Sequence, residues 1–203
     1  GVYKPAASGC VRQKGELISE DALTLWEAAG RPLSLAEVCP QRFEAPLAPH
    51  LAARLEGKAV DPRLLREGLR PWQQWADVVL IEGAGGLMSP ISDEDYVADL
   101  AYEFGYPLLV VSKNVLGTIN HTLLTLIAAT TFREGLEIGG IVLNEPHPRD
   151  PQDISVESNL AELAARCVPP VLAQVKHGEN RFEPAVEWSA IVQKARPKKL
   201  PDW

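Results

Sequence analysis

The sequence predicts an α/β protein with a mostly parallel β-sheet. Uninterrupted apolar runs at residues 77–81, 107–112 and 138–143 are typical of strands that are buried on both faces of a sheet. Segments with the helical spacing of apolar residues separate these runs along the chain. Strands that alternate with helices form βαβ units with right-handed crossovers, and such units place their strands parallel to one another.

The other elements follow from local patterns. Residues 1–5 are typical of the end of a strand, and residues 171–175 of a short one. Asp61 and Pro62 predict a helix start, since an acidic N-cap is followed by proline at the first helical position. The expected helices cover residues 21–29, 48–55, 62–75, 95–104, 120–133 and about 155–166. Without repeats or a linker, we expect one domain over residues 1–203, with a tail at 197–203.

Composition excludes several classes of function. The net charge of −7 over 203 residues argues against general affinity for nucleic acid or an anionic membrane. No stretch approaches the ~20 apolar residues that span a bilayer, and no secretory leader is seen at the start. The three cysteines are odd in number and far apart, so they favour neither a disulfide framework nor a zinc site. We expect a cytoplasmic protein.

The most informative segment is residues 78–86, VVLIEGAGG, in which an apolar run ends in Glu82 and small residues follow. Ligands of open α/β sheets bind beyond the carboxyl ends of the strands, and glycines let the backbone approach them closely. A carboxylate there suits Mg²⁺, which binds nucleotides through one or two carboxylates plus phosphate oxygens. The alternative is a plain glycine-rich turn with a solvated glutamate.

Two charged residues of the first segment are further candidates. Lys4 follows a strand end and precedes a small-residue loop with Ser8 and Gly9, so its ammonium is placed to reach a ligand. A surface lysine beside a turn is the alternative. Asp21 either complements the positive end of a helix or serves as a second Mg²⁺ carboxylate, which requires it to approach Glu82 in space.

Three later segments carry weaker signals. Residues 116–121, LGTINH, open a helix whose free N–H groups suit a carboxylate or phosphate, although a plain capped junction gives the same pattern. Asn144 ends a strand, where its amide presents a donor and an acceptor to a purine or simply forms a turn before Pro146. Residues 42–50 line an aliphatic pocket or form an ordinary loop. The sequence contains neither GxGxxG nor GxxxxGK[ST], and no catalytic triad is evident.

Taken in order, these motifs resemble the dethiobiotin synthetase family. The matching pieces are residues 3–9 (YKPAASG), 21–23 (DAL), 43–50, 79–93 (VLIEGAGGLMSPISD), 116–121 (LGTINH) and Asn144. The resemblance implies a P-loop NTPase-like three-layer fold and a homodimer with a shared active site. It also implies an ATP- and Mg²⁺-dependent cyclo-ligase of biotin synthesis, which joins CO₂ to 7,8-diaminononanoate through a carbamate and a carbamic-phosphoric anhydride.

The resemblance also implies a role for each matching residue. Lys4 would neutralise the carbamate and the transferring phosphate, and Ser8 would contact the substrate. Asp21 and Glu82 would hold Mg²⁺ beside ATP. The remaining contacts would come from Gly83, Ala84 and Gly85 to the nucleotide, from Gly117, Thr118, Ile119 and Asn120 to the partner subunit's substrate, and from Asn144 to adenine.

The sequence departs from the family pattern in two places. The family's N-terminal strand, Gly-Lys-Thr loop and first helix are not among these residues, so we expect little turnover by these 203 residues alone. Residues 175–177 read VKH where the family has Ile-Pro near the adenine. Two alternatives therefore stand: an inactive dimeric scaffold that lost ATP turnover, or another member of the same NTPase superfamily.

Overall fold

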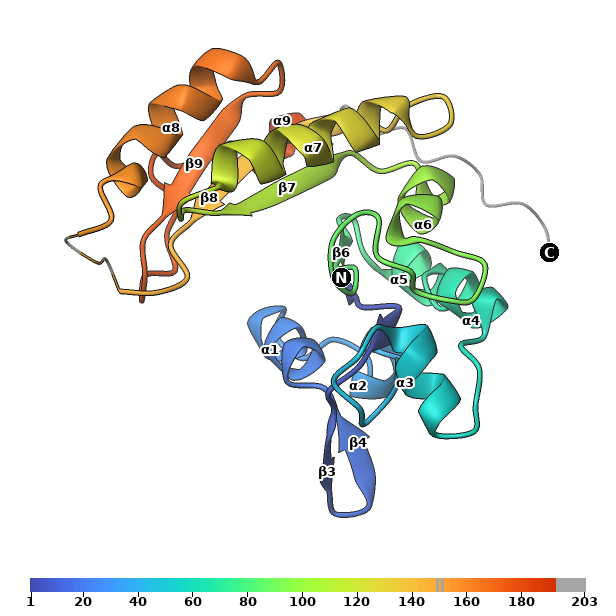
Figure 1. The fold of residues 1–203 in the computed structure, drawn as a ribbon. Coiled ribbons are helices and arrows are strands. Elements are labelled where there is room, and N and C mark those ends of the chain that lie inside the picture. The colour runs from blue at the N-terminus through green and yellow to red at the C-terminus, as the bar shows by residue number, and fades with distance from the viewer. Residues whose placement is uncertain (149, 151, 193–203) are drawn as a thin grey trace. The chain divides into compact units, whose positions relative to one another are not determined.

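The computed structural model describes residues 1–148, 150 and 152–192, which fold into two compact units (Figure 1). The first unit comprises residues 1–100, and the second begins at Ala101. The tail expected at residues 197–203 lies outside the described residues. That the whole chain forms one domain stays a prediction.

The first unit is built on short pairs of strands. β1 (Val2–Tyr3) pairs in parallel with β6 (Leu80–Ile81), and β2 (Ala6–Ala7) pairs in parallel with β5 (Gln41–Arg42). β3 (Val11–Gln13) and β4 (Glu16–Ile18) form an antiparallel hairpin that extends away from the rest of the unit (Figure 1). Parallel pairs of strands distant in sequence are the arrangement that the apolar runs predict, although β6 is shorter than the expected strand 77–81.

Several helices belong to this unit, and the first two pack against β1. The first three are α1 (Glu20–Ala28), α2 (Leu35–Val38) and α3 (Pro49–Leu55), and α6 (Val97–Phe104) begins near the end of the unit. The single helix expected at 62–75 is wrong, because α4 (Pro62–Glu67) and α5 (Arg70–Trp75) are separate. Pro71 has no N–H to donate to the Glu67 carbonyl, so the first helix ends before it.

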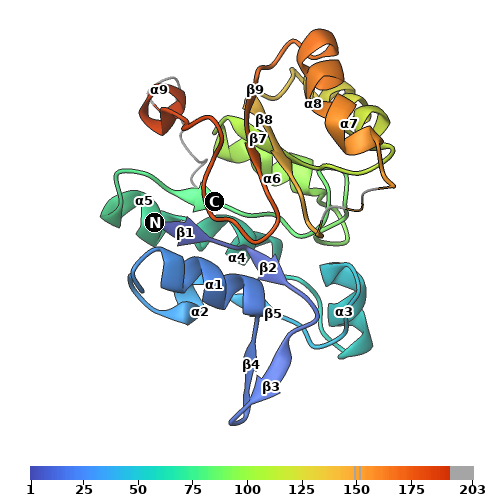
Figure 2. The ribbon, with the colours of Figure 1, turned by 90° about the vertical axis from the view of Figure 1, so that its left-hand side faces the viewer.

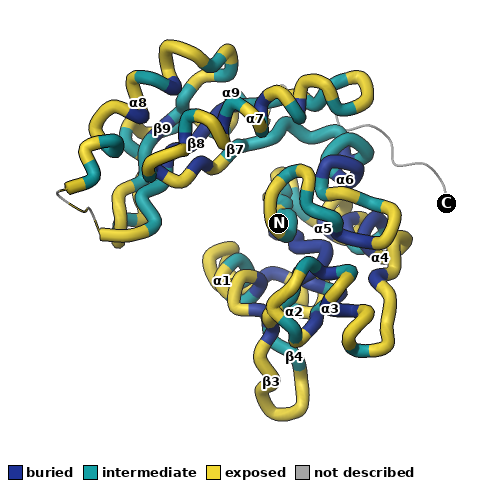
Figure 3. Tube along the Cα trace, viewed as in Figure 1, coloured by how far each residue is buried: buried dark blue, intermediate teal, exposed yellow. Residues whose placement is uncertain are grey.

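Large side chains fill the centre of the first unit. Tyr3, Leu65, Leu69 and Trp72 are fully buried there. Figure 3 draws the buried segments of the unit in dark blue. The Tyr3 hydroxyl donates to the Leu65 carbonyl at 2.8 Å, which ties β1 to α4. Trp72 Nε1 donates to the Glu37 carbonyl at 3.1 Å, which ties α5 to α2. These contacts hold the strand end that precedes Lys4 in a fixed place.

The second unit contains a three-stranded parallel sheet. Its order is β7 (Leu108–Lys113), β8 (Ile138–Asn144) and β9 (Val171–Val175). α7 (Thr118–Thr131) packs against β7 and α8 (Ser155–Arg166) against β9, both on the same face of the sheet (Figure 2). Ile191 of α9 (Trp188–Val192) lies against Gly139 of β8. The expected strands and helices of this unit are confirmed to within two residues at each end.

None of the helices in the described part of the chain is long and apolar enough to cross a membrane.

Candidate functional site

Lys4 and Glu82 lie side by side because two parallel strands end together. Tyr3 is paired with Ile81, so the residues that follow them leave the same edge of the β1–β6 pair. Lys4 Nζ donates to Glu82 Oε1 at 2.6 Å and to the Gly83 carbonyl at 3.2 Å. Glu82 at the strand end therefore has a specific partner, the buried lysine that follows the neighbouring strand.

Asp21 reaches the same ammonium from α1. Ser19 caps this helix by accepting from the Ala22 N–H at 3.2 Å, which places Asp21 in the first turn. Asp21 Oδ2 lies 3.0 Å from Lys4 Nζ. The approach of Asp21 to Glu82 that a shared metal requires is therefore observed, with both carboxylates on one cationic atom.

The three side chains differ sharply in exposure. The Lys4 side chain is only 4% exposed, whereas those of Asp21 and Glu82 are 64% and 45% exposed. Burial by itself lowers the pKa of the ammonium, but the hydrogen bonds and charges of Glu82 and Asp21 outweigh burial and raise the Lys4 pKa above its ordinary value. Lys4 is therefore a fixed positive charge, while the two carboxylates face solvent.

The donor set fits Mg²⁺. Carboxylate oxygens are its preferred protein ligands, and the ion commonly takes only one or two of them plus phosphate oxygens and water. Asp21 and Glu82 already converge on one cation, the Lys4 ammonium. In the described ranges no three His, Cys, Asp or Glu side chains gather into a metal cluster. Asp21 and Glu82 thus suit a metal that a nucleotide completes, not an all-protein cage.

The glycine turn, residues 83–86, follows Glu82, and two of its glycines leave no room for a side chain. A Cβ on Gly83 would lie 2.7 Å from Val97 Cγ1, and one on Gly85 would lie 2.5 Å from Ser89 Oγ. Gly85 also has φ +82°, which favours glycine. Gly85 and Gly86 are exposed, and the Gly86 N–H donates to Ser89 Oγ at 2.9 Å. That residues 83–85 contact a nucleotide stays a prediction.

The loop with Ser8 is held against residues 43–45. Gly9 N–H donates to the Ala45 carbonyl at 3.1 Å, and Cys10 N–H donates to the Phe43 carbonyl at 2.9 Å. Ser8 is half-buried, and its hydroxyl has no hydrogen-bond partner among the residues described. This hydroxyl is therefore available to a ligand.

Residues 42–50, expected to line a pocket or form a loop, have mixed roles. Arg42 Nη1 donates to the Leu17 carbonyl at 2.8 Å and so supports the hairpin that leads into α1. His50 Nδ1 is buried without a hydrogen-bond partner in the part of the chain that the structure covers. Neither observation decides between the two expectations.

In the second unit, residues 117–120 begin α7. Gly117 is the N-cap at φ +94°. As a glycine it has no side chain that could accept a capping hydrogen bond. Thr118 N–H donates to the Val115 carbonyl and His121 N–H to the Gly117 carbonyl. Over the described residues, the N–H groups of Ile119 and Asn120 have no acceptor. A helix start with open N–H groups suits an anion, as expected from the sequence.

Asn144 ends β8, and its backbone carbonyl accepts from the Asn114 N–H at 2.7 Å. Its side-chain amide is half-buried and has no hydrogen-bond partner within the described ranges, so it is open to a ligand. Beyond these strand ends lies a cavity of about 190 Å³, lined by residues that include Asn114, Glu145, His147 and Asp153.

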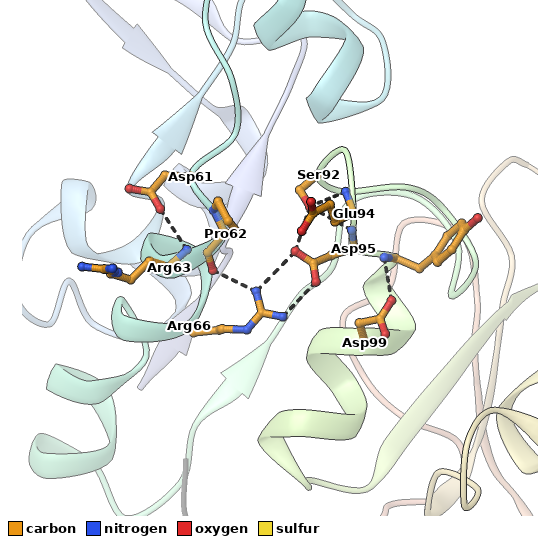
Figure 4. Close-up of polar contacts among 9 residues, drawn as sticks. Asp61, Pro62, Arg63, Arg66, Ser92, Glu94, Asp95 and Asp99 are labelled. Atoms are coloured by element: carbon orange, nitrogen blue, oxygen red, sulfur yellow. Dashed lines mark hydrogen bonds and ion pairs between the residues drawn. The ribbon is translucent and has the colours of Figure 1, made fainter. Parts of the chain in front are cut away.

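Sequence reasoning missed two polar networks. In the second unit, Asn159 Nδ2 donates to Asn114 Oδ1 at 2.9 Å, and Gln174 Nε2 donates to Glu145 Oε1 at 2.7 Å. Asn114 follows a strand end as Asn144 does, so the same signal could have found it. In the first unit, Arg66 pairs with Asp95 in a buried contact (Figure 4), for which the sequence offers no signal.

Comparisons with known proteins identify the family of the chain. A family model described as an AAA domain matches residues 1–180. A protein of Rhodopirellula baltica is 45% identical over 187 residues, covering 87% of this chain and 72% of its own length. One of Anaeromyxobacter dehalogenans strain 2CP-1 is 47% identical over 161 residues, covering 79% and 69%. One of Anoxybacillus flavithermus is 31% identical over 187 residues, covering 92% and 82%. Each is named as an ATP-dependent dethiobiotin synthetase BioD.

Proposed function

Because the chain belongs to the dethiobiotin synthetase family, a family of P-loop NTPase-like cyclo-ligases, we propose that it forms dethiobiotin from 7,8-diaminononanoate, CO₂ and ATP. This reaction is a step of biotin synthesis, and we propose the cytoplasm as its location. The observation that carries the proposal is the buried Lys4 ammonium, held at the end of β1 beside Glu82 and Asp21. A fixed cation beside solvent-facing carboxylates suits phosphoryl transfer, in which charge neutralisation and positioning do most of the catalysis.

Lys4 is the proposed catalytic residue. One amine of the substrate adds to CO₂ and loses a proton, which gives a carbamate. A carbamate oxygen then attacks the γ-phosphorus of ATP as the bond to the β-phosphate oxygen breaks, and ADP leaves. The second amine attacks the carbonyl carbon of the mixed anhydride and loses a proton, phosphate leaves, and the ureido ring closes. The protonated Lys4 stabilises the negative charge that is present throughout the transfer, and Ser8 contacts the carbamate.

Asp21 and Glu82 are the proposed Mg²⁺ ligands. Bound there, the ion would neutralise phosphate charge and orient the γ-phosphate. Both carboxylates contact Lys4 in this structure, so with the metal bound each would interact with the ammonium and the ion together. Their exposure of 64% and 45% leaves oxygens free for a second cation.

The nucleotide contacts are assigned by chemistry. Gly83, Ala84 and Gly85 offer exposed or half-exposed backbone next to Glu82, which suits phosphate. Asn144 offers an unpaired amide with a donor and an acceptor, which suits the edge of adenine.

The segment Gly117, Thr118, Ile119 and Asn120 is proposed to bind the substrate carboxylate of a partner subunit. Its support is the pair of open N–H groups at the start of a 14-residue helix. The homodimer that this assignment requires is supported by exposed apolar side chains on or just before the same helix: Leu116, Leu124 and Ile127.

The test compares two lysine variants in the chain as its gene encodes it, with any residues before Gly1 included. Lys4→Met removes the ammonium from the site, whereas Lys58→Met removes an exposed lysine that pairs with Glu56 at the surface. Dethiobiotin formation from diaminononanoate, bicarbonate and Mg·ATP is measured. We expect Lys4→Met to lower kcat by a factor on the order of 10² to 10³ and Lys58→Met to leave it unchanged.

Two results would count against the proposal. An inactive wild-type chain that still dimerises would favour the scaffold alternative. A Lys4→Met chain with wild-type kcat would remove Lys4 from the mechanism while leaving the family reaction in place.

A further inference from the structure

We propose that Arg66 is a positioning residue for the glycine turn, acting through Asp95 and the loop of residues 87–96. The inference rests on the proposed function, since that function gives the turn its role beside the phosphates. Arg66 itself lies on α4 and belongs to none of the assigned binding segments.

The contact between Arg66 and the loop is a two-point ion pair. Arg66 Nη2 donates to Asp95 Oδ1 at 2.8 Å, and Nη1 donates to Asp95 Oδ2 at 3.3 Å (Figure 4). Nη1 also donates to the Pro62 carbonyl at 2.9 Å, which fixes the guanidinium on its own helix. A planar guanidinium that makes two hydrogen bonds to one carboxylate sets its orientation as well as its distance.

Asp95 organises the far end of the loop. Its side chain accepts from Ser92 Oγ at 2.7 Å, and its carbonyl accepts from the Ile91 N–H at 2.8 Å and the Ser92 N–H at 3.2 Å. Ser92 Oγ in turn accepts from the N–H groups of Glu94 and Asp95 (Figure 4). Fixing Asp95 therefore fixes residues 91–95 as one piece.

The near end of this loop holds the glycine turn. Ser89 Oγ accepts from the Gly86 N–H at 2.9 Å, and Ser89 N–H donates to the Gly86 carbonyl at 2.9 Å. The Ser89 carbonyl accepts from the Val97 N–H at 3.0 Å, and Val97 lies directly against Gly83. The path from Arg66 to the turn is thus continuous through Asp95, the loop and Val97.

The Arg66–Asp95 pair is more deeply buried than a second ion pair to the same loop, Arg54–Asp93. The side chains of Arg66 and Asp95 are 9% and 11% exposed, whereas Arg54 and Asp93 pair at 2.7 Å with 66% and 58% exposure. Exposed pairs restrict their partners little, and buried pairs with several hydrogen bonds hold one geometry. Arg54→Met is therefore a matched control, because it removes a loop contact without removing a buried anchor.

The main test is hydrogen exchange at the backbone N–H groups of residues 83–97. The variant Arg66→Met/Asp95→Met removes both charges together, which keeps a buried charge from being left alone and preserves the fold. We expect exchange about tenfold faster across the glycine turn and the loop in this variant, with wild-type exchange in Arg54→Met. If the double variant does not fold, Arg66→Lys keeps the charge but loses the two-point contact, and its turn should exchange several-fold faster.

Kinetics give a second readout. A displaced turn should raise the KM for ATP about tenfold while the KM for diaminononanoate stays unchanged, since only the nucleotide contacts are affected. A folded variant with wild-type exchange at residues 83–86 and a wild-type KM for ATP would overturn the inference. If the wild-type chain forms no dethiobiotin, the proposed function fails, and the exchange measurement still decides whether Arg66 positions the turn.

Discussion

Lys4 and its two carboxylates should respond unequally to mutation. Lys4→Met removes the ammonium and leaves Asp21 and Glu82, whose side chains are 64% and 45% exposed and remain hydrated. Exposed charges that lose a partner change stability little, so we expect a loss of about 1 kcal/mol or less. Asp21→Asn/Glu82→Gln instead leaves an ammonium that is 4% exposed without a charged partner. Such a stranded charge costs about 3–5 kcal/mol.

Deprotonation of Lys4 limits the stability loss of the double variant Asp21→Asn/Glu82→Gln and makes that loss depend on pH. A stranded Lys4 can lose its proton, and from its ordinary pKa of 10.5 this costs about 5 kcal/mol at pH 7 but only about 2 kcal/mol at pH 9. The penalty of the double variant should therefore shrink over this range. The wild type behaves oppositely: its raised Lys4 pKa adds stability that is complete below pH 10.5 and is lost as the pH rises through the folded-state value.

Urea unfolding of the three chains at pH 7 and pH 9 measures both effects, provided that the slope of the free energy against urea stays constant. The expected order of stability at pH 7 is wild type, Lys4→Met, then the double variant. A Lys4→Met chain less stable than the double variant would refute the reasoning, as would a double-variant penalty that does not change between pH 7 and pH 9.

Three further predictions concern separate parts of the chain. Gly68→Ala should cost about 1–3 kcal/mol in urea unfolding, since its methyl would collide with the Tyr3 hydroxyl, whereas Gly86→Ala, with 3.9 Å to Ser89 Oγ, should cost less. Burial raises the pKa of the Cys39 thiol from 9.0 to about 12, so its stabilising contribution is complete below pH 9 and falls by about 3 kcal/mol by pH 11. Unfolding curves of Cys39→Ala should lack this part of the alkaline loss. Asn120→Asp should raise the KM for diaminononanoate about tenfold in steady-state assays by repelling its carboxylate, and Asn120→Ala should raise it less.

The elements that sequence predicts best here are those with long apolar runs. β7, β8 and β9 fall where the apolar runs predict strands, and α8 falls where the helical spacing of its apolar residues predicts a helix. The expected burial on both faces holds for β8, whose Ile141, Val142 and Leu143 are buried in succession, but not for β7, where Val111 is 65% exposed. The β3–β4 hairpin was missed, since its strands have no buried residue and carry no apolar run. Its turn has positive φ at both Lys14 and Gly15, the conformation of a two-residue hairpin turn, and lysine there hides the usual signal.

Some residues of the candidate site could likewise be predicted from the sequence, and others could not. Lys4 and Glu82 could be found because each directly follows a strand, and parallel strands bring such positions to one edge. Asp21 could be suspected but not placed, since its approach depends on the direction of α1 after a hairpin that the sequence did not reveal. Arg66 and Asp95 are 29 positions apart on a helix and a loop, and nothing local marks either as buried. Their partnership arises only from tertiary packing.

The contrast between these two ion-pair groups bears on how the site works. Around Lys4 the cation is buried and the anions are exposed, so the anions remain free to take a second cation. In the Arg66–Asp95 pair both members are buried and further hydrogen bonds hold them, so neither is free to exchange partners. The first arrangement suits binding and the second suits rigidity. A site that must accept a charged nucleotide beside a glycine-rich turn requires both, because exposed charges attract the ligand and a fixed loop keeps the backbone in place to receive it.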